Sequence, residues 1–319
     1  MSPAKALRPK PIVRIEGMAK SEAAEDMLAV EEPLEIRVAG HGVAVVMRTP
    51  GHDRELVAGF LVTEGIVRRR DEVLDMVRCG ADPASRHPLD STGAPPGGAR
   101  PAGAGGEGSE NVVDVLLAPG CAVDFARLTR HVFTSSSCGI CSRTSIDAVR
   151  GAFPPIAAPL SPRRGVLAAL PERLRAAQAA FAATGGLHAS ALFDASGTLE
   201  VVREDVGRHN ALDKVVGHAF FAEKLPLAGR ILLVSGRVSF EIMQKALAAG
   251  IPCVAAISAP TSAAVEFAQE SGQALVGFLR PATGSTSSRQ AGSRLRQGFG
   301  GQAGPGAMRM NVYAGTLAE

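Results

Sequence analysis

Two cysteines separated by two residues are the strongest chemical signal in this chain. Cys138 and Cys141 stand in residues 134–143, Thr-Ser-Ser-Ser-Cys-Gly-Ile-Cys-Ser-Arg, behind a run of hydroxyl residues. The thiolate, not the thiol, is the sulfur nucleophile and the metal ligand, and a Cys-X-X-Cys turn lowers the pKa of a thiol. The segment therefore predicts a reactive thiol pair on a loop.

The same spacing also occurs in half of a structural zinc site. Structural zinc takes four ligands, and the sequence contains no second Cys-X-X-Cys and no His-X-X-X-His to complete such a set. The remaining cysteines, Cys79, Cys121 and Cys253, stand singly beside apolar residues. The pattern favours a sulfur nucleophile over a metal site.

Residues 202–214 form a second chemically dense segment, Val-Arg-Glu-Asp-Val-Gly-Arg-His-Asn-Ala-Leu-Asp-Lys. Its glycine lets a backbone approach closely, and Arg208 and His209 can meet phosphate or polar ring atoms at the start of a helix. The alternative interpretation is a solvated turn before a helix, with Asn210 as the N-cap.

Residues 235–239, Ser-Gly-Arg-Val-Ser, form a third such segment. They follow an apolar run and precede a helical pattern, which is where α/β sheets bind ligands beyond their strand ends. An ordinary turn would have a similar composition. Arg237 is the side chain of this segment that could contact a ligand.

Alternating helix and strand patterns surround these segments and predict an α/β layered core. Short apolar runs are typical of buried strands, and apolar positions at helical spacing separate them. The expected strands are residues 34–39, 43–48, 111–117, 189–193, 230–235, 251–257 and 274–279. The expected helices are residues 52–67, 171–184, 210–221, 240–249 and 261–271. The strand, helix, strand unit over 230–257 predicts parallel pairing of its strands.

Composition divides the chain into structured and low-complexity parts. Residues 81–110 and 282–308 consist mainly of small and polar residues, which cannot bury enough apolar surface to offset the entropy lost on ordering. We expect a disordered N-terminus at 1–24, an N-terminal α/β subdomain at 25–130 with the disordered loop 81–110, a catalytic cysteine loop at 131–150, and a C-terminal domain at 151–319 with the low-complexity insert 282–308.

Composition also excludes several classes of protein. Of the 319 residues 46% are hydrophobic and 20% charged, as in a soluble globular protein, and a net charge of +3 is too small to indicate nucleic-acid binding. Residues 246–265 lack charge, but glycine and proline interrupt them and they are too weakly apolar to enter a membrane. The N-terminal residues lack the apolar stretch of a secretory signal, so we expect a cytoplasmic protein.

Several strings that span most of the chain together resemble the formate dehydrogenase accessory sulfurtransferase family, the FdhD-like proteins. They are LAVEEPLEIR at 28–37, MRTPG at 47–51, GFLVTEGI at 59–66, SSSCGIC at 135–141, REDVGRHNALDK at 203–214, SGRVSFE at 235–241 and SAPTS at 258–262. The resemblance implies an α/β (α+β) fold, with a cytidine-deaminase-like layered core and a smaller N-terminal α/β subdomain.

The same resemblance implies a sulfurtransferase that acts as a sulfur carrier. In this family a cysteine desulfurase supplies sulfane sulfur to a loop cysteine, and the persulfide passes it to the molybdenum bis(molybdopterin guanine dinucleotide) cofactor, which then enters formate dehydrogenase. Cys138 matches the persulfide position, and Cys141 would be an auxiliary thiol. The cofactor is thus a bound acceptor and no group is permanently held. The resemblance also implies a homodimer.

Cofactor contacts are implied near the C-terminus. The family's Phe-X-Arg-X-X-Arg element is divided in this chain between Phe278, Leu279 and Arg280 before the insert and Arg309 after it. Closing a loop of that length costs about 1 kcal/mol more than closing a short turn, so the halves can converge. Ser142 and Arg143 replace the family's usual Gly-Lys, which keeps a positive charge. The further expected contacts are Arg203, Asp205, Arg208, His209, Arg237 and Lys245.

Three other functions fit parts of the sequence. A chaperone that binds the molybdenum cofactor without transferring sulfur would not need Cys138. A zinc nucleobase deaminase would use His188 in its His-X-Glu motif, but Ser190 stands at the acid's position and no proline precedes the cysteine pair. A thioredoxin-like oxidoreductase would need a short thioredoxin pattern around residue 138, and the sequence does not have one.

Overall fold

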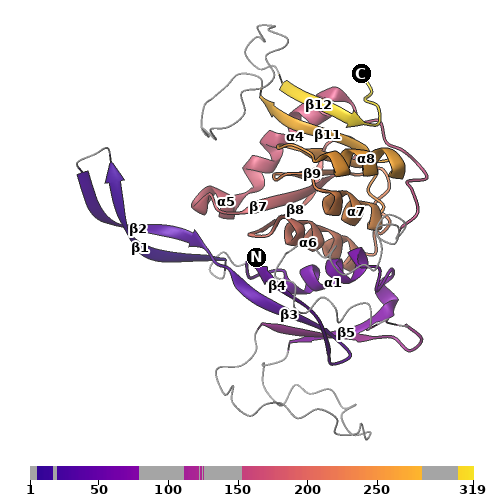
Figure 1. The fold of residues 1–319 in the computed structure, drawn as a ribbon, viewed down its shortest axis with the longest axis horizontal. Helices are drawn as coiled ribbons and strands as arrows, with labels where there is room; N and C mark the ends of the chain where they lie inside the picture. Colours follow the sequence, from indigo (N-terminus) through magenta and orange to yellow (C-terminus); the bar gives the residue numbers. More distant parts are fainter. Residues whose placement is uncertain are drawn as a thin grey trace, which may run out of the picture.

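The computed structural model describes residues 6–16, 20–78, 111–121, 123, 125, 153–281 and 308–319, and its centre is a six-stranded mixed sheet. In spatial order its strands are β12 (Met308–Ala314), β11 (Ala274–Pro281), β10 (Cys253–Ala256), β9 (Ile231–Val234), β7 (His188–Phe193) and β8 (Leu199–Asp205). Strands β9, β10 and β11 run parallel, whereas β12, β7 and β8 pair antiparallel with their neighbours (Figure 1).

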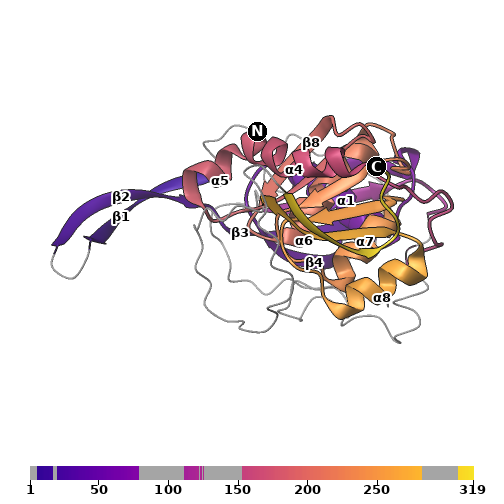
Figure 2. The ribbon, with the colours of Figure 1, turned by 90° about the horizontal axis from the view of Figure 1, so that it is seen from above.

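Helices cover both faces of this sheet (Figure 2). One face carries α4 (Arg164–Ala177) and α5 (Ala179–Thr184), and the other carries α6 (Arg208–Phe221), α7 (Phe240–Ala248) and α8 (Ser262–Ser271). Successive side chains of a strand point to opposite faces. In β9, Ile231 and Leu233 belong to the hydrophobic cluster that includes α4, and Leu232 and Val234 to the cluster that includes α6 and α7. This two-sided burial explains why the strand is apolar throughout.

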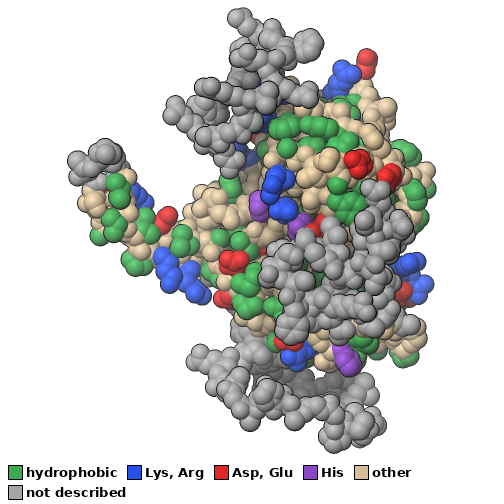
Figure 3. All heavy atoms as spheres, viewed as in Figure 1, with side chains coloured by type: hydrophobic (Ala, Val, Ile, Leu, Met, Phe, Trp, Pro, Cys, Tyr) green, Lys and Arg blue, Asp and Glu red, His purple; other side chains and the backbone are tan. Residues whose placement is uncertain are grey.

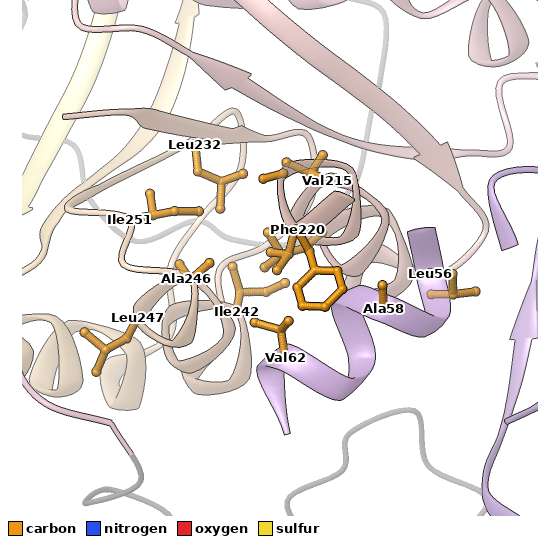
Figure 4. Packing of buried hydrophobic residues seen from close by; sticks show 14 of the residues in the cluster. Leu56, Ala58, Val62, Val215, Phe220, Leu232, Ile242, Ala246, Leu247 and Ile251 are labelled. Carbon is orange, nitrogen blue, oxygen red and sulfur yellow. The ribbon is translucent and has the colours of Figure 1, made fainter. Parts of the chain in front are cut away.

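A four-stranded sheet lies beyond α6. Its spatial order is β4 (His41–Arg48), β3 (Glu32–Val38), β6 (Val112–Leu117) and β5 (Val73–Arg78), and the short 3-10 helix η2 (Arg70–Glu72) precedes β5. Helix α1 (Asp53–Thr63) packs against α6, and Figure 4 shows its Val62 close to Phe220 and Ile242. One hydrophobic cluster runs from Ile36 of β3 through these residues to Leu275 of β11. The N-terminal and C-terminal parts therefore share one core.

The α/β fold class expected from the sequence is confirmed, and so is the parallel pairing of β9 with β10. One strand was not predicted, and two expectations about helix starts were wrong. Residues 199–205 form strand β8, which their charged residues concealed. Pro171 lies inside α4 and does not begin a helix. Asn210 is not the N-cap of α6: the cap is Gly207, and the amide of Asn210 donates to the carbonyl of Met47 at 2.7 Å.

A two-stranded arm projects from the body of the protein (Figure 1). It consists of β1 (Leu7–Glu16) paired antiparallel with β2 (Lys20–Ala29), so the expectation that residues 1–24 lack regular structure was wrong for 7–16 and 20–24. The prolines of β1 concealed the strand, because proline lacks an N–H, but an edge strand tolerates it where that N–H would face solvent. Val13 and Ile15 are 66% and 70% exposed, and hydrophobic side chains cover much of the arm in Figure 3.

Candidate functional site

The segments that follow the parallel strands meet the N-terminal ends of α6 and α7 at one edge of the six-stranded sheet. Gly236 follows β9, and a Cβ atom on it would lie 3.2 Å from Nδ1 of His188 and 3.6 Å from Cδ of Arg208. The N–H of Val238 donates to the carbonyl of Ala259 at 3.1 Å, which joins the segment after β9 to the segment after β10. Ligands of α/β proteins bind at such edges. We call this region the sheet-edge site and define it by His188, Arg208, His209, Arg237, Glu241, Phe278 and Arg280.

Arg208 and Arg237 add two guanidinium groups to that of Arg280 in the sheet-edge site. Arg208 is the first residue of α6 and is half-buried, and Arg237 is exposed. Burial, together with the charges of these two arginines, lowers the pKa of His188. The imidazole is therefore neutral at pH 7. Positive side chains beside helix N-termini suit an anionic ligand.

His209 and Glu241 form a buried pair between α6 and α7. Nε2 of His209 lies 3.2 Å from Oε2 of Glu241, and the two side chains are 8% and 6% exposed. Burial raises the pKa of Glu241 to about 7, although the charge of Lys245 acts in the opposite direction. The carboxyl group of Glu241 can therefore gain or lose a proton near neutral pH. Glu241 was not among the site residues expected from the sequence. Its signal was an acidic residue in the first turn of the helix that follows residues 235–239.

Strand β11 contains a bulge at the expected cofactor contacts. Its register with β12 shifts between Gly277 and Arg280, and Phe278 has a φ of 54°. In a regular strand successive side chains point to opposite faces of the sheet, and a bulge changes the direction in which they point. The N–H of Phe278 donates to the carbonyl of Ser258 at 3.0 Å, and the guanidinium of Arg280 lies 5.4 Å from the centre of the Phe278 ring. Leu279 is fully buried in the cluster that includes α4, so it supports the bulge from inside.

Arg309 lies beside Arg280. The two residues are register partners in the antiparallel pairing of β11 with β12, and both side chains are exposed. The two halves of the divided Phe-X-Arg-X-X-Arg element therefore meet across residues 282–308, as the small cost of loop closure allows.

Asp205 fixes the start of α6 through bonds to groups inside the protein. Its carboxylate lies 2.6 Å from Nζ of Lys214, and both side chains are fully buried. It also accepts the N–H of Thr49 at 3.1 Å and the N–H of Gly207 at 2.8 Å. These bonds hold the turn that precedes Arg208, so Asp205 contributes to the sheet-edge site by fixing the position of Arg208.

Arg203 and Lys245 are likewise held in internal ion pairs. Arg203 donates to both carboxylate oxygens of Glu55, at 2.5 Å and 2.7 Å. Nζ of Lys245 donates to both oxygens of Asp213, at 3.0 Å and 2.9 Å. Burial alone would lower the pKa of Lys245, but the neighbouring carboxylates outweigh it and raise that pKa. The structure does not bring these two side chains to the sheet edge as free charges.

Cys138, Cys141 and the whole expected loop 131–150 lie outside the described residues. Of the cysteines that the structure does describe, Cys253 is buried and its pKa is raised by burial to about 12, which makes it unreactive. The described residues contain no group of three His, Cys, Asp or Glu side chains that could hold a metal ion. Within the same residues, no helix has the length and apolar character needed to cross a membrane.

Comparison with known proteins places these features in a family. The model of the FdhD/NarQ family matches residues 29–289. Over 260 residues the chain is 50% identical to the protein named Sulfur carrier protein FdhD from Mycolicibacterium paratuberculosis, which covers 81% of this chain and 88% of that protein. Its counterpart from Streptomyces avermitilis is 49% identical over 281 residues, covering 85% and 90% of the two chains.

One solved structure has the same fold. It is described as a "putative formate dehydrogenase accessory protein" from Desulfotalea psychrophila, and it superposes with a TM-score of 0.64 over 97% of each chain at 18% sequence identity.

Proposed function

The chain belongs to the FdhD/NarQ family, and from that premise we propose that it is a sulfur carrier protein required for formate dehydrogenase activity. In this proposal Cys138 accepts sulfane sulfur from a cysteine desulfurase and passes it to the molybdenum bis(molybdopterin guanine dinucleotide) cofactor. The observation that carries the proposal is the match over residues 29–289, which includes the Cys-X-X-Cys segment, to relatives that bear the sulfur-carrier name.

Loading of Cys138 is a thiol and persulfide exchange. The Cys138 thiol loses its proton, and its thiolate attacks the outer sulfur of the desulfurase persulfide. A new bond forms between that sulfur and Cys138, the bond to the desulfurase cysteine breaks, and the released desulfurase thiolate takes up a proton. Cys141, separated from Cys138 by two residues, is an auxiliary thiol that protects or resolves the persulfide.

The sheet-edge site would hold the cofactor that receives the sulfur. Arg208, Arg237, Arg280 and Arg309 supply positive charge for phosphate groups, and Phe278 offers a ring face. His209 provides a polar contact. Asp205, Arg203 and Lys245 contribute through the ion pairs that hold α6 and α7, and Leu279 contributes by supporting the β11 bulge.

Mass spectrometry tests the carrier role directly. The protein is incubated with a cysteine desulfurase and L-cysteine, and we expect an adduct of one sulfur atom on the peptide that contains Cys138. The Cys138→Ala variant should show no adduct there and should not restore formate dehydrogenase activity to cells that lack this protein. Cys121→Ala, which removes a thiol elsewhere in the described structure, is the matched control and should behave as the native protein.

The same experiment separates this proposal from a cofactor chaperone. If Cys138→Ala restored full formate dehydrogenase activity, the protein would bind and deliver the cofactor without transferring sulfur. We also propose that the protein works in the cytoplasm as a homodimer. Sedimentation analysis of the purified protein tests the second point, and a mass of one chain would contradict it.

A further inference from the structure

The contact between His209 and Glu241 connects the sheet-edge site to the interior of the protein. His209 is the second residue of α6 and Glu241 the second residue of α7, so both lie in the first turns of helices that begin at the site. Their side chains approach to 3.2 Å and are almost fully buried. His209 is not needed to hold the start of α6, because Asp205 already anchors that turn through the N–H of Gly207.

Charged groups from every neighbouring element act on Glu241. Helix α6 contributes Arg208 and Asp213, α7 contributes Lys245, and Glu64 follows the end of α1. Toward the sheet edge lie His188 of β7 and Arg237 of the segment after β9. The carboxyl group of Glu241 thus lies between the buried charges of Asp213, Lys245 and Glu64 and the guanidinium groups of the sheet-edge site.

Buried polar atoms without a hydrogen-bond partner lie in these same elements. Ser190 is 1% exposed, and it lies on the face of β7 turned toward α6, because Leu192 two residues later belongs to the cluster that includes α6. Among the described residues, Oγ of Ser190, Oγ of Ser239 and Nε of Arg208 lack a hydrogen-bond partner. Native proteins leave few buried polar groups unpaired, and a bound ligand is one explanation of such groups.

We propose that Glu241, held against His209, is a proton-binding residue of the sheet-edge site: it takes up a proton when an anionic ligand binds beside Arg208 and Arg237, and it releases that proton when the ligand leaves. The inference rests on the proposed function only for the identity of the ligand, whose phosphate groups carry the negative charge.

The direction of this coupling follows from electrostatics. A phosphate bound at the guanidinium groups adds negative charge near Glu241, which disfavours the carboxylate as Asp213 and Glu64 already do. Its pKa therefore rises further when the ligand binds, and the complex holds more protons than the free protein. By linkage, a lower pH must then strengthen ligand binding.

Isothermal titration calorimetry with GDP, a soluble part of the cofactor, measures the coupling. Titrations at pH 7 in buffers of different ionisation enthalpy give the number of protons taken up for each GDP bound. We expect the uptake of about half a proton, because a group with a pKa near 7 is about half protonated before binding and becomes more fully protonated afterwards. A rise of one pH unit in that pKa would favour GDP binding at pH 6 over pH 8 by a factor of about five, measured relative to the same ratio in Glu241→Gln, because the GDP phosphate also titrates in this range.

Variants assign the proton to its residue. Glu241→Gln mimics the protonated carboxyl group, so GDP should still bind while the proton uptake falls to near zero. Glu223→Gln, at an exposed position after α6, is the matched control and should keep the native uptake. Binding of GDP by the native protein with no proton uptake would overturn the inference and leave the proposed function standing. Unchanged uptake in Glu241→Gln would also overturn it. The absence of any GDP binding at pH 6 and pH 8 would overturn the inference and the proposed role of the sheet-edge site in holding the cofactor, whereas the adduct on Cys138 tests sulfur transfer separately.

Discussion

Gly59 of α1 and Gly217 of α6 lie at the crossing of the two helices, where each backbone touches the other. A Cβ atom on Gly59 would be 1.8 Å from the carbonyl oxygen of Asp213, and one on Gly217 would be 1.8 Å from the carbonyl oxygen of Glu55. This close crossing places Glu55 within reach of Arg203 and brings Thr63 to 2.9 Å from Asp213. The two glycines therefore determine how the N-terminal part is joined to the elements that carry the sheet-edge site.

Gly59→Ala should destabilise the protein by about 3 kcal/mol or more, because the helices must separate and an overpacked core loses about that much. Chemical denaturation followed by circular dichroism measures the free energy of unfolding. Gly165→Ala is the matched control: Gly165 also lies in a helix, but a Cβ there would meet no atom within 4 Å. That variant should be unchanged or more stable by about 0.5 kcal/mol. Equal effects of the two substitutions would contradict the role of the crossing.

The sequence predicts the buried strands of the sheet well, because their apolar runs can be recognised without knowing which residues lie around them in the fold. The runs around Leu232 and Val254 are apolar throughout, and they form β9 and β10. The arm is the opposite case. Strand β1 contains prolines and charged residues, and what makes it a strand is its pairing with β2, which no local pattern reveals.

The candidate site was predicted in part, for a related reason. Arg208 and Arg237 lie at the sheet edge, as their positions beside expected strand ends and helix starts indicated, and Phe278, which the family resemblance implied, lies there too. Arg203 was also expected to contact a ligand. Its partner Glu55 is 148 residues away along the chain, so only the folded structure shows that the two side chains form an ion pair. Glu241 was missed because its burial against His209 depends on the packing of two helices.

Lys214→Met should cost about 3–5 kcal/mol of stability, because it leaves the carboxylate of Asp205 buried without its cation. Urea denaturation of the variant and of Lys224→Met, an exposed lysine in the turn after α6, gives the comparison. The control should change by less than about 0.5 kcal/mol. Adding Asp205→Asn to Lys214→Met should restore part of the loss, since the unpaired charge is removed. If the single substitution cost no more than its control, the buried pair would not anchor α6.

Arg237→Gln should weaken ligand binding without affecting the fold. The side chain is exposed, so its removal should change the melting temperature little, while the loss of one guanidinium contact to phosphate should lower GDP affinity about tenfold. The salt dependence of binding should also become weaker. Arg164→Gln, an exposed arginine of α4 on the opposite face of the sheet, is the control and should bind GDP as the native protein does. Equal affinities for the two variants would remove Arg237 from the site.

Glu241→Gln should stabilise the protein, and more so at high pH. Burial raises the pKa of Glu241 from 4.5 to about 7, so between these values the folded protein holds a proton that the unfolded chain has lost. The native free energy of unfolding therefore falls as the pH rises through this window, and it stays lowered above pH 7. The ionisation of Glu241 in the unfolded chain lowers the native free energy of unfolding by about 1 kcal/mol at pH 5 and by about 3 kcal/mol at pH 8. Glutamine does not ionise, so the variant does not lose this stability. Urea denaturation at the two pH values measures the difference, with Glu223→Gln as the control. A variant that gained the same stability at both pH values, or that lost stability at pH 8, would contradict this prediction. Glu241 would then be ionised in the folded protein without a loss of stability, and it would have no proton to exchange near neutral pH.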